Sequence, residues 1–323
     1  MATVVRGPNW ECVTPAAAWE PRDSCAELVY RDCFWIMGGW FTPKTPNPRD
    51  VWKSSDGRHW EKVLQEAPWE KSDLPGSLVF RDRMWHMGGR SLPGTECSNE
   101  VWSTQDGIRW ECATRQAGWC PRLGPGTAVF KDRMWVFGGT SDFYHANDQT
   151  LFNDIWSSED GRTWRLECAA APWAPRACHQ VVAMDGRLWL TAGGAWIAGS
   201  PVYGDVWCSE DGVHWECVLE QAPWSPRVWH GSVAYRGCLW VVAGDARVND
   251  APCLLNDVWF SQDGVDWRRL ESEVVFSRRH EVSMVVFQDR MWLAGGHAMP
   301  LTHDVWALTL PQDFPAGLAS QEI

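Results

Sequence analysis

The chain of 323 residues lacks the features that mark several classes of protein. It has no run of about eighteen or more apolar residues, which excludes a transmembrane helix. Its first stretch, MATVVRGPNWEC, has no basic region followed by a long apolar one, so we expect no secretory signal and a cytoplasmic protein. Basic residues are few. The 29 Lys and Arg face 41 Asp and Glu, and the net charge of −12 disfavours nucleic acid and anionic membranes as partners.

The sequence has twelve cysteines but no Cys-x-x-Cys pair and no zinc-ligand spacing. Cys12, Cys112 and Cys217 each follow Trp-Glu in copies of one repeated phrase, which places them in separate structural units too far apart to bridge. We therefore predict free thiols, mostly small and buried, in a reducing compartment.

Tryptophan, by contrast, is abundant, and many of the 26 residues belong to one repeated phrase. The phrase reads acidic, β-branched, Trp, then a Ser-x-Asp-Gly turn and a second Trp, as in DVWCSEDGVHW from Asp205. Asp-Gly between strand-forming residues predicts a hairpin, because glycine accepts the positive φ of the tight turn. Further copies begin at Asp50, Glu100, Asp154 and Asp257, and a truncated copy begins at Asp304.

Three further parts precede this hairpin in every repeat. A lead-in segment such as APWSPR (Ala222 to Arg227) comes before a short apolar run and a turn, and a second strand then ends in a pair of small residues. Four short strands per unit, at a period of about fifty residues, predict an all-β, six-bladed propeller with four-stranded blades. The small pairs are Gly38–Gly39, Gly88–Gly89, Gly138–Gly139, Ala192–Gly193, Ala243–Gly244 and Gly295–Gly296.

The two ends of the chain complement each other. The sixth copy stops after its third strand, and Gly7 to Cys12 matches Gly212 to Cys217. We therefore predict that residues 1–14 supply the outer strand of blade 6 and close the ring, which removes exposed sheet edges. In this interpretation residues 1–311 form a single propeller and residues 312–323 a dispensable tail.

The paired small residues, the Trp-containing strands and the Pro-Arg-x-x-His phrase of the lead-in resemble kelch repeats, in the bacterial variety with Ser-x-Asp-Gly-x-x-Trp turns. The resemblance covers about residues 7 to 309 and implies the propeller fold of galactose oxidase. It allows oxidase, lyase or isomerase chemistry: copper oxidation, iron-assisted rearrangement as in plant nitrile-specifier proteins, or metal-free sialic acid mutarotation. No copper or iron ligand pattern of these enzymes carries over residue by residue.

Residues that depart from the repeat are the candidates for function. Twenty-three of the 26 tryptophans fall on repeat positions, where we expect them to form the core between blades. Trp40, Trp196 and Trp229 remain, and all three belong to segments predicted to lie on one face, formed by the lead-ins and the loops between the second and third strands. They are expected to form an aromatic platform for a sugar ring, a flat heterocycle or a side chain of a partner protein, or alternatively to cover their own blades.

Five arginines share one lead-in position. In an acidic protein, a ring of guanidinium groups at the channel mouth would attract a carboxylate, sulfate or phosphate. Alternatively, each arginine pairs with a loop carboxylate or caps backbone carbonyls within its own blade. The five are Arg22, Arg122, Arg176, Arg227 and Arg279.

Histidines gather on the same face. His179 and His230 stand in the Pro-Arg-x-x-His phrase, where a structural role is the alternative to ligand binding. Three more depart from the repeat within one blade, and with Glu281 they are candidate ligands for one divalent metal ion, the alternative being isolated surface histidines. These three are His280, His297 and His303.

Two functions fit this face. The first is binding of a small anionic, aromatic or sugar-like ligand, with possible catalysis, to which Tyr144 and Asp245 in the variable loops would contribute. The second is non-catalytic docking of an acidic peptide on the same face. No Ser-His-Asp arrangement or phosphate-binding glycine loop is present.

Overall fold

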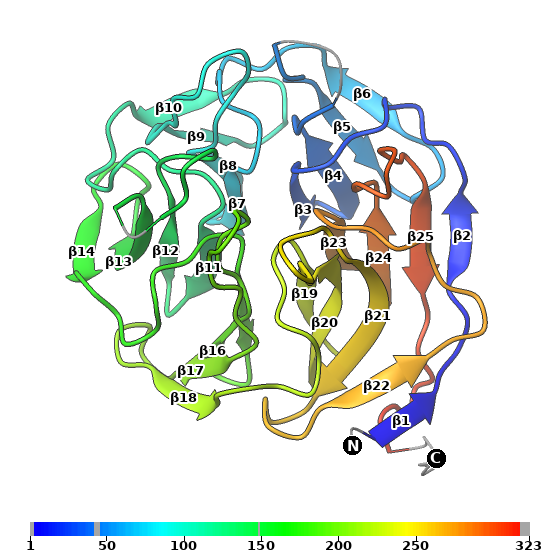
Figure 1. The fold of residues 1–323 in the computed structure, drawn as a ribbon. Coiled ribbons are helices and arrows are strands. Elements are labelled where there is room, and N and C mark those ends of the chain that lie inside the picture. Colours follow the sequence, from blue (N-terminus) through cyan, green and yellow to red (C-terminus); the bar gives the residue numbers. More distant parts are fainter. Residues whose placement is uncertain (1–2, 42–45, 148, 317–323) are drawn as a thin grey trace.

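The computed structural model describes residues 3–41, 46–147 and 149–316, and all of their strands belong to six sheets arranged as the blades of a ring (Figure 1). The described residues include no helix, and so none that could cross a membrane. The prediction of an all-β, six-bladed propeller is confirmed.

Each blade has four antiparallel strands that follow one another from the axis outward. The inner strands are β3 (Ala26–Tyr30), β7 (Gly76–Phe80), β11 (Gly126–Phe130), β15 (Gln180–Met184), β19 (Gly231–Tyr235) and β23 (Ser283–Phe287). The second strands are β4 (Cys33–Met37), β8 (Arg83–Met87), β12 (Arg133–Thr140), β16 (Arg187–Thr191), β20 (Cys238–Asp245) and β24 (Arg290–Ala294). The third strands are β5 (Val51–Ser54), β9 (Val101–Thr104), β13 (Leu151–Ser158), β17 (Val206–Ser209), β21 (Leu254–Ser261) and β25 (Val305–Leu308). The outer strands are β6 (Glu61–Leu64), β10 (Glu111–Thr114), β14 (Arg165–Cys168), β18 (Glu216–Leu219), β22 (Arg268–Glu271) and β2 (Glu11–Thr14).

The ring closes through the N-terminal segment, as predicted. β2 pairs with β25 and is the fourth strand of blade 6. The preceding β1 (Thr3–Arg6), predicted to belong to the same blade, instead runs parallel to β22 and becomes a fifth strand of blade 5. The reason is apolar burial and edge protection: Val5 enters the core beside Leu270, and β1 covers the open edge of β22.

The first residues of the predicted C-terminal tail pack against the propeller. Phe314 is buried, and its ring lies 5.4 Å from that of Trp240 and 5.0 Å from that of Phe260. The segment after β25 therefore packs into the core as far as this residue, so the prediction of a dispensable tail from residue 312 is wrong there. Residues 317–323 lie outside the described part of the chain.

Tryptophans form the contacts between blades, and twenty of the 26 are buried. The Ser-x-Asp-Gly turns are built to receive them. In blade 3, Ser158 Oγ accepts the N–H of Gly161 at 2.8 Å, and Asp160 Oδ1 accepts the two N–H groups that follow. Gly161 has φ 71°, and a Cβ there would lie 2.0 Å from the ring of Trp85 in the neighbouring blade. The turn therefore has a structural role, since only glycine fits both its backbone and this contact.

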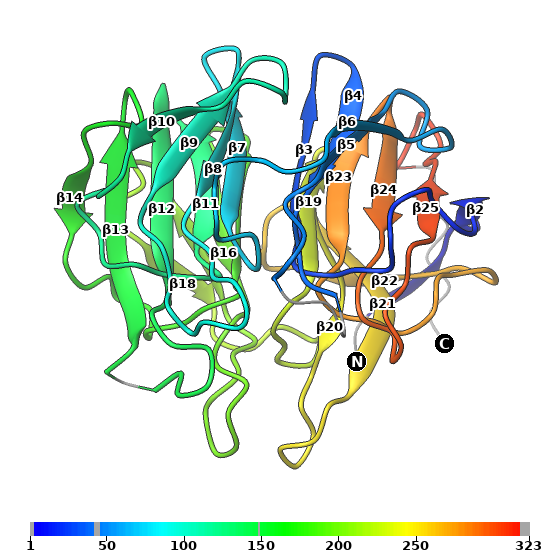
Figure 2. The same cartoon turned by 90° about the horizontal axis from the view of Figure 1, so that it is seen from above.

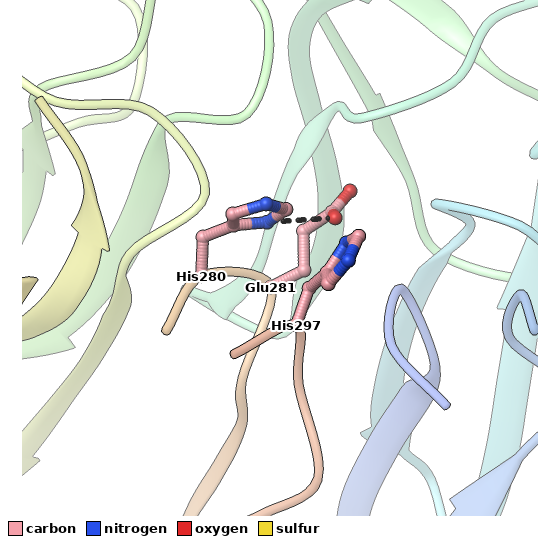
Figure 3. A group of neighbouring side chains, drawn as sticks. All are labelled: His280, Glu281 and His297. Atoms are coloured by element: carbon pink, nitrogen blue, oxygen red, sulfur yellow. Dashed lines mark ion pairs between the residues drawn. The ribbon is translucent and has the colours of Figure 1, made fainter. Parts of the chain in front are cut away.

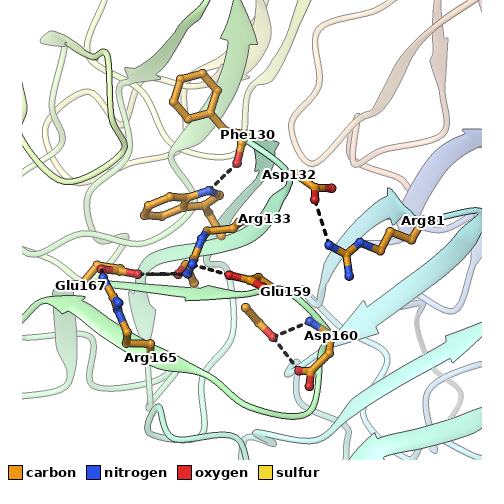
Figure 4. Close-up of polar contacts among 11 residues, drawn as sticks. Arg81, Phe130, Asp132, Arg133, Glu159, Asp160, Arg165 and Glu167 are labelled. Atoms are coloured by element: carbon orange, nitrogen blue, oxygen red, sulfur yellow. Dashed lines mark hydrogen bonds and ion pairs between the residues drawn. The ribbon is translucent and has the colours of Figure 1, made fainter.

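Exposed ion pairs join neighbouring blades on the side of these turns. Arg81 of blade 2 reaches Asp132 of blade 3 at 2.9 Å (Figure 4). Such exposed pairs contribute about 1 kcal/mol or less each. The loops between second and third strands extend from the opposite side of the ring, where those of blades 4 and 5 project furthest (bottom of Figure 2).

Candidate functional site

On the side of the long loops, two segments of every blade meet at the inner end of the sheet. The residue after the lead-in arginine position forms an antiparallel bridge with the residue after the small pair. We term these twelve residues the axial ring; the bridged pairs are Asp23–Trp40, Asp73–Arg90, Leu123–Thr140, Ala177–Gly194, Val228–Asp245 and His280–His297. Their backbone positions repeat but their side chains do not, so the chemistry of this ring differs from blade to blade.

The small pairs hold the axial ring in place. In all six blades, the N–H of the second residue of the pair donates to a lead-in carbonyl of the following blade, as from Gly39 to Ser72 at 2.8 Å. Gly39 has φ 98°, and a Cβ there would lie 2.4 Å from the carbonyl oxygen of Asp23. A larger residue would therefore push apart the bridge that carries Asp23 and Trp40.

The next residue of each lead-in has a left-handed backbone in all six blades, with φ between 53° and 57°. We term these six residues the collar: Ser24, Leu74, Gly124, Cys178, Trp229 and Glu281. Five backbone hydrogen bonds of 2.8 to 3.4 Å link them from blade to blade. A left-handed conformation at five non-glycine residues is costly, and such strain is typical of functional sites.

One half of the axial ring, in blades 6, 1 and 2, is polar. His280 Nδ1 lies 2.9 Å from Glu281 Oε2, without the alignment of a hydrogen bond, and His297 lies beside both (Figure 3). One ligand atom from each of these three residues falls within 4.8 Å of the others. His297 Nδ1 also lies 3.5 Å from Asp23 Oδ2. Nitrogen and oxygen donors at this spacing can exchange protons or bind a cation.

In blade 2 the pair of the axial ring is an ion pair. Arg90 Nε donates to Asp73 Oδ2 at 2.7 Å, and both side chains are buried. The guanidinium group lies over the ring of Phe143, 3.6 Å from its centroid, and 5.5 Å from that of Tyr144. Aromatic rings of a long loop thus cover one face of this cation.

Burial sets the charges of the polar half. Burial raises the pKa of Asp23 well above its usual range, and the carboxylates of Glu281 and Asp73 raise it further. Burial also raises the pKa of Asp73, to about 6, although Arg90 partly offsets the effect. Burial alone would raise the pKa of Glu281, but the adjacent His280 and the hydrogen bond from Ser24 outweigh it, and the pKa is lowered. Crowding of these carboxyl groups therefore keeps them in different protonation states.

The opposite half of the ring, in blades 3 to 5, is apolar except for Thr140 and Asp245. Leu123, Ala177 and Val228 are fully buried in one cluster with Cys178 of the collar and with Trp196 and Trp229. This cluster closes its half of the ring, so the open space lies over the polar half.

That space is a pocket of about 330 Å³. Its walls are the polar half of the axial ring, Asp245, and the loop residues Leu92, Phe143, Tyr144, Arg247 and Pro252. Four buried polar atoms on its walls have no hydrogen-bond partner within the described protein: Arg90 Nη1, Trp229 Nε1, Asp245 Oδ2 and His280 Nδ1. Unpartnered buried polar atoms are rare and costly, so their gathering around one pocket indicates a binding site.

A channel of about 240 Å³ lies beyond the collar, between the inner strands. Ser24, Trp229 and Glu281 line both the channel and the pocket. Glu27 projects into the channel, where burial raises its pKa to about 8.

The five lead-in arginines do not face the pocket, which corrects the prediction of a positive ring. Each is fully buried and pairs bidentately with the aspartate that opens the hairpin of its own blade, as Arg227 does with Asp257 at 2.7 and 2.8 Å. The same aspartate accepts the indole N–H of Trp259, two residues further along the chain, at 2.7 Å. The alternative of pairing within the blade is confirmed, because the guanidinium groups are neutralised below the surface. The pairs are Arg22–Asp50, Arg122–Asp154, Arg176–Asp205, Arg227–Asp257 and Arg279–Asp304.

The three tryptophans outside the repeat do lie near one another, but they form no exposed platform. Trp40 is half-buried in the pocket wall, 6.2 Å from the ring of His297. Trp229 is buried and stacks on His280 at 4.9 Å, and Trp196 packs behind it at 5.0 Å. Trp40 and Trp229 therefore line the pocket, and Trp196 packs behind Trp229.

The predicted histidines separate into three places. His280 and His297 lie in the pocket wall, whereas His303 binds the carbonyl of Trp19 through Nδ1 at 3.0 Å and lies outside the cluster. His179 and His230 are buried in the channel wall, and burial lowers the pKa of both. Tyr144 and Asp245 both line the pocket.

Sequence reasoning missed Arg90, Asp23 and Asp73 in this pocket. A usable signal was present, because the residue after the small pair reads Trp, Arg, Thr, Gly, Asp and His along the six repeats. A search of every column of the repeat, rather than of Trp, His and Arg alone, would have found that this position varies in chemistry while its neighbours repeat.

All twelve cysteines are free, as expected, but only Cys178, Cys208 and Cys238 are buried, so the prediction that most are buried is wrong.

Comparison with known proteins supports the fold alone. No profile of a protein family matches the chain. No curated protein matches it either. Among solved structures, one entitled "Structure of YjhT" is 15% identical and covers 96% of this chain and 100% of its own, with a TM-score of 0.73. The chain is therefore similar to that protein in its propeller architecture.

Proposed function

We propose that this propeller binds a small sugar-like ligand, a ring bearing several hydroxyl groups, in the pocket over the polar half of the axial ring. The observation that carries the proposal is the pair of buried atoms Arg90 Nη1 and Asp245 Oδ2, neither of which has a hydrogen-bond partner in the described protein, although Asp245 Oδ2 lies 3.6 Å from Arg247 Nη1. One is a donor and the other an acceptor, and a hydroxyl group can serve either.

The remaining walls fit such a ligand. Trp40 and the half-exposed Tyr144 offer ring faces on which a sugar ring can stack. The volume of about 330 Å³ falls in the range of small-molecule sites. An acidic ligand is less favoured, because Arg90 and Arg247 already face Asp73 and Asp245, and Asp23 and Glu281 add further carboxyl groups.

We also assign the repeat to the kelch type. Support comes from the small pairs, which bond each blade to the next, and from the lead-in arginine, which pairs with the hairpin aspartate in five blades. Both features give the residues quoted for the resemblance a defined role in the fold.

The test is a calorimetric titration of the full chain with a panel of galactose, glucose, glucuronate and N-acetylneuraminate. We expect at least one of them to bind, and Asp245→Asn to weaken that binding by about tenfold or more, because it replaces the free acceptor with a donor. Trp40→Ala should weaken it by about tenfold through lost stacking. Arg115→Ala, on an exposed side chain outside the pocket, is the control and should leave affinity unchanged.

Two results would overturn the proposal. One is the absence of binding by every sugar at millimolar concentration. The other is binding that neither pocket variant weakens. An acidic peptide that binds where all sugars fail would favour the docking alternative. NMR spectra of the bound sugar over time would reveal isomerisation, elimination or oxidation.

A further inference from the structure

We propose that His280, Glu281 and His297 form a binding site for one divalent transition-metal ion in the wall of the pocket. This inference goes beyond the sugar-binding proposal and does not depend on it, since it concerns the metal alone.

The backbone holds the three donors in a defined arrangement. His280 and His297 face each other across an antiparallel bridge, with N–H to carbonyl bonds of 3.2 and 2.9 Å in the two directions. Glu281 belongs to the collar, where its N–H donates to the carbonyl of Trp229 at 2.8 Å. The ligand atoms therefore come from rigid parts of the blade and already lie within 4.8 Å of one another (Figure 3).

The donor set selects the class of metal. Two imidazoles and one carboxylate suit Zn²⁺, Fe²⁺ and similar first-row ions, whereas Mg²⁺ and Ca²⁺ prefer oxygen ligands alone. Three protein ligands would leave positions for water or for a hydroxyl group of a bound molecule. The side chain of His297 is 26% exposed, so the site opens to the pocket.

Neighbouring residues orient the ligands, as outer residues do in metal sites. The ring of Trp229 stacks on that of His280 at an interplanar angle of 27°. Ser24 Oγ donates to Glu281 Oε1 at 2.9 Å, which leaves Oε2 to face His280 Nδ1. That nitrogen has no hydrogen-bond donor or acceptor aligned with it in the described protein.

The charge of the pocket also favours a cation. Four carboxyl groups, Asp23, Asp73, Asp245 and Glu281, line it, against the two guanidinium groups of Arg90 and Arg247. Even with Asp23 protonated, the three other carboxylates outnumber the two guanidinium groups, and buried carboxylates in excess of their cations favour binding of a cation.

The experiment uses the untagged full chain, stripped with a chelator and titrated with Co²⁺, whose visible spectrum reports its ligands. We expect one equivalent to bind with a spectrum of nitrogen and oxygen ligation and without sulfur charge transfer, which excludes the twelve thiols. Zn²⁺ should displace it. His297→Ala, at the most exposed ligand, should weaken Co²⁺ binding by more than about a hundredfold, and Ser24→Ala, which removes an outer contact, by about tenfold.

His303→Ala is the matched control, because it removes a histidine of the same blade outside the cluster and should bind Co²⁺ like the wild type. Thermal melts would show that all three variants are folded. The inference is overturned if the wild type takes up no stoichiometric Co²⁺, or if His297→Ala, shown to be folded, binds it as tightly as His303→Ala. Titration of the metal-free protein with sugars tests the sugar proposal by itself, so failure of the metal proposal can be distinguished from failure of the sugar proposal.

Discussion

The two halves of the axial ring share one backbone and have opposite chemistry. In blades 6, 1 and 2 the bridged positions carry His280, His297, Asp23, Trp40, Asp73 and Arg90, whereas blades 3 and 4 carry Leu123, Thr140, Ala177 and Gly194 at the same places. The backbone bonds between blades are the same in both halves. The difference shows that a repeated scaffold can hold a binding site on one side while it closes the other side with packing. Four predictions, each a change in the free energy of unfolding, would break or sharpen this comparison.

The lead-in arginines belong to the scaffold that both halves share, so Arg227→Ala should have the largest effect of the four. It would leave Asp257 buried without its partner, so we expect the free energy of unfolding to fall by about 4 kcal/mol. Urea denaturation measures the change. Arg115→Ala, which removes an exposed ion pair with Glu100, should lower the free energy of unfolding by at most about 1 kcal/mol. Equal losses in the two variants would mean that the lead-in arginines contribute no more to stability than exposed arginines do.

The second prediction sets one half directly against the other. Leu123→Ala should lower the free energy of unfolding by about 3 kcal/mol, because Leu123 is fully buried in the apolar cluster. His297→Ala, at a pocket-facing position of the polar half, should change it by less than about 1 kcal/mol. Denaturant titrations of both variants without added metal make the comparison. A larger loss in His297→Ala would mean that the polar half is built for packing.

The third prediction concerns His86 in β8, which stacks on Trp69 at 4.2 Å and whose pKa burial lowers to about 3. As the pH falls, the unfolded chain binds the proton at a higher pH than the folded chain does. The neutral His86 of the folded chain therefore contributes fully to stability above about pH 6.5, and this contribution is lost towards pH 3. Four other blades place Val or Leu at this position, and blade 1 places Ile. His86→Leu should therefore be more stable than the wild type by about 2 kcal/mol at pH 5, with a smaller difference at pH 7.5. A difference that does not change with pH would show that His86 binds its proton as readily in the folded chain as in the unfolded one.

The smallest effect is expected for Glu27→Gln in the channel. Since burial raises the pKa of Glu27 to about 8, the folded chain holds a proton that the unfolded chain loses above about pH 4.5. Wild-type stability should therefore decrease from pH 4.5 to pH 8, and the variant should gain about 1 kcal/mol relative to it at pH 8, limited by water in the channel. Thermal melts at pH 5 and pH 8 would measure this gain. No gain at pH 8 would mean that the channel solvates the carboxylate fully.

Several parts of the fold followed from local signals. The Asp-Gly turns, the small pairs and the alternation of short strands are each caused by backbone requirements that a residue type reveals, such as the positive φ of Gly39 or Gly161. Closure by Glu11–Thr14 followed because the first residues repeat the end of a hairpin that blade 6 lacks. The place of Thr3–Arg6 did not follow, because a parallel pairing with β22 leaves no turn signal in the sequence.

The site was harder to predict for a different reason. Arg227 and Val228 are adjacent, yet one pairs inside its blade and the other packs at the axis. Composition could point to arginine as an anion site, but only the distance to Asp257 shows that the charge is already neutralised. Arg90 was not predicted, because it follows the small pair and does not share the position of the lead-in arginines. Its burial against Asp73 and Phe143 depends on two other segments of the chain.

By itself, the sequence determined the number of blades, the order of their strands and the closure of the ring, because these depend on contacts within a repeat or between adjacent copies. The tertiary structure decided which side chains meet at the axis, since those twelve positions come from six blades far apart along the chain. Burial then set their charges, through the desolvation of groups that no local pattern brings together.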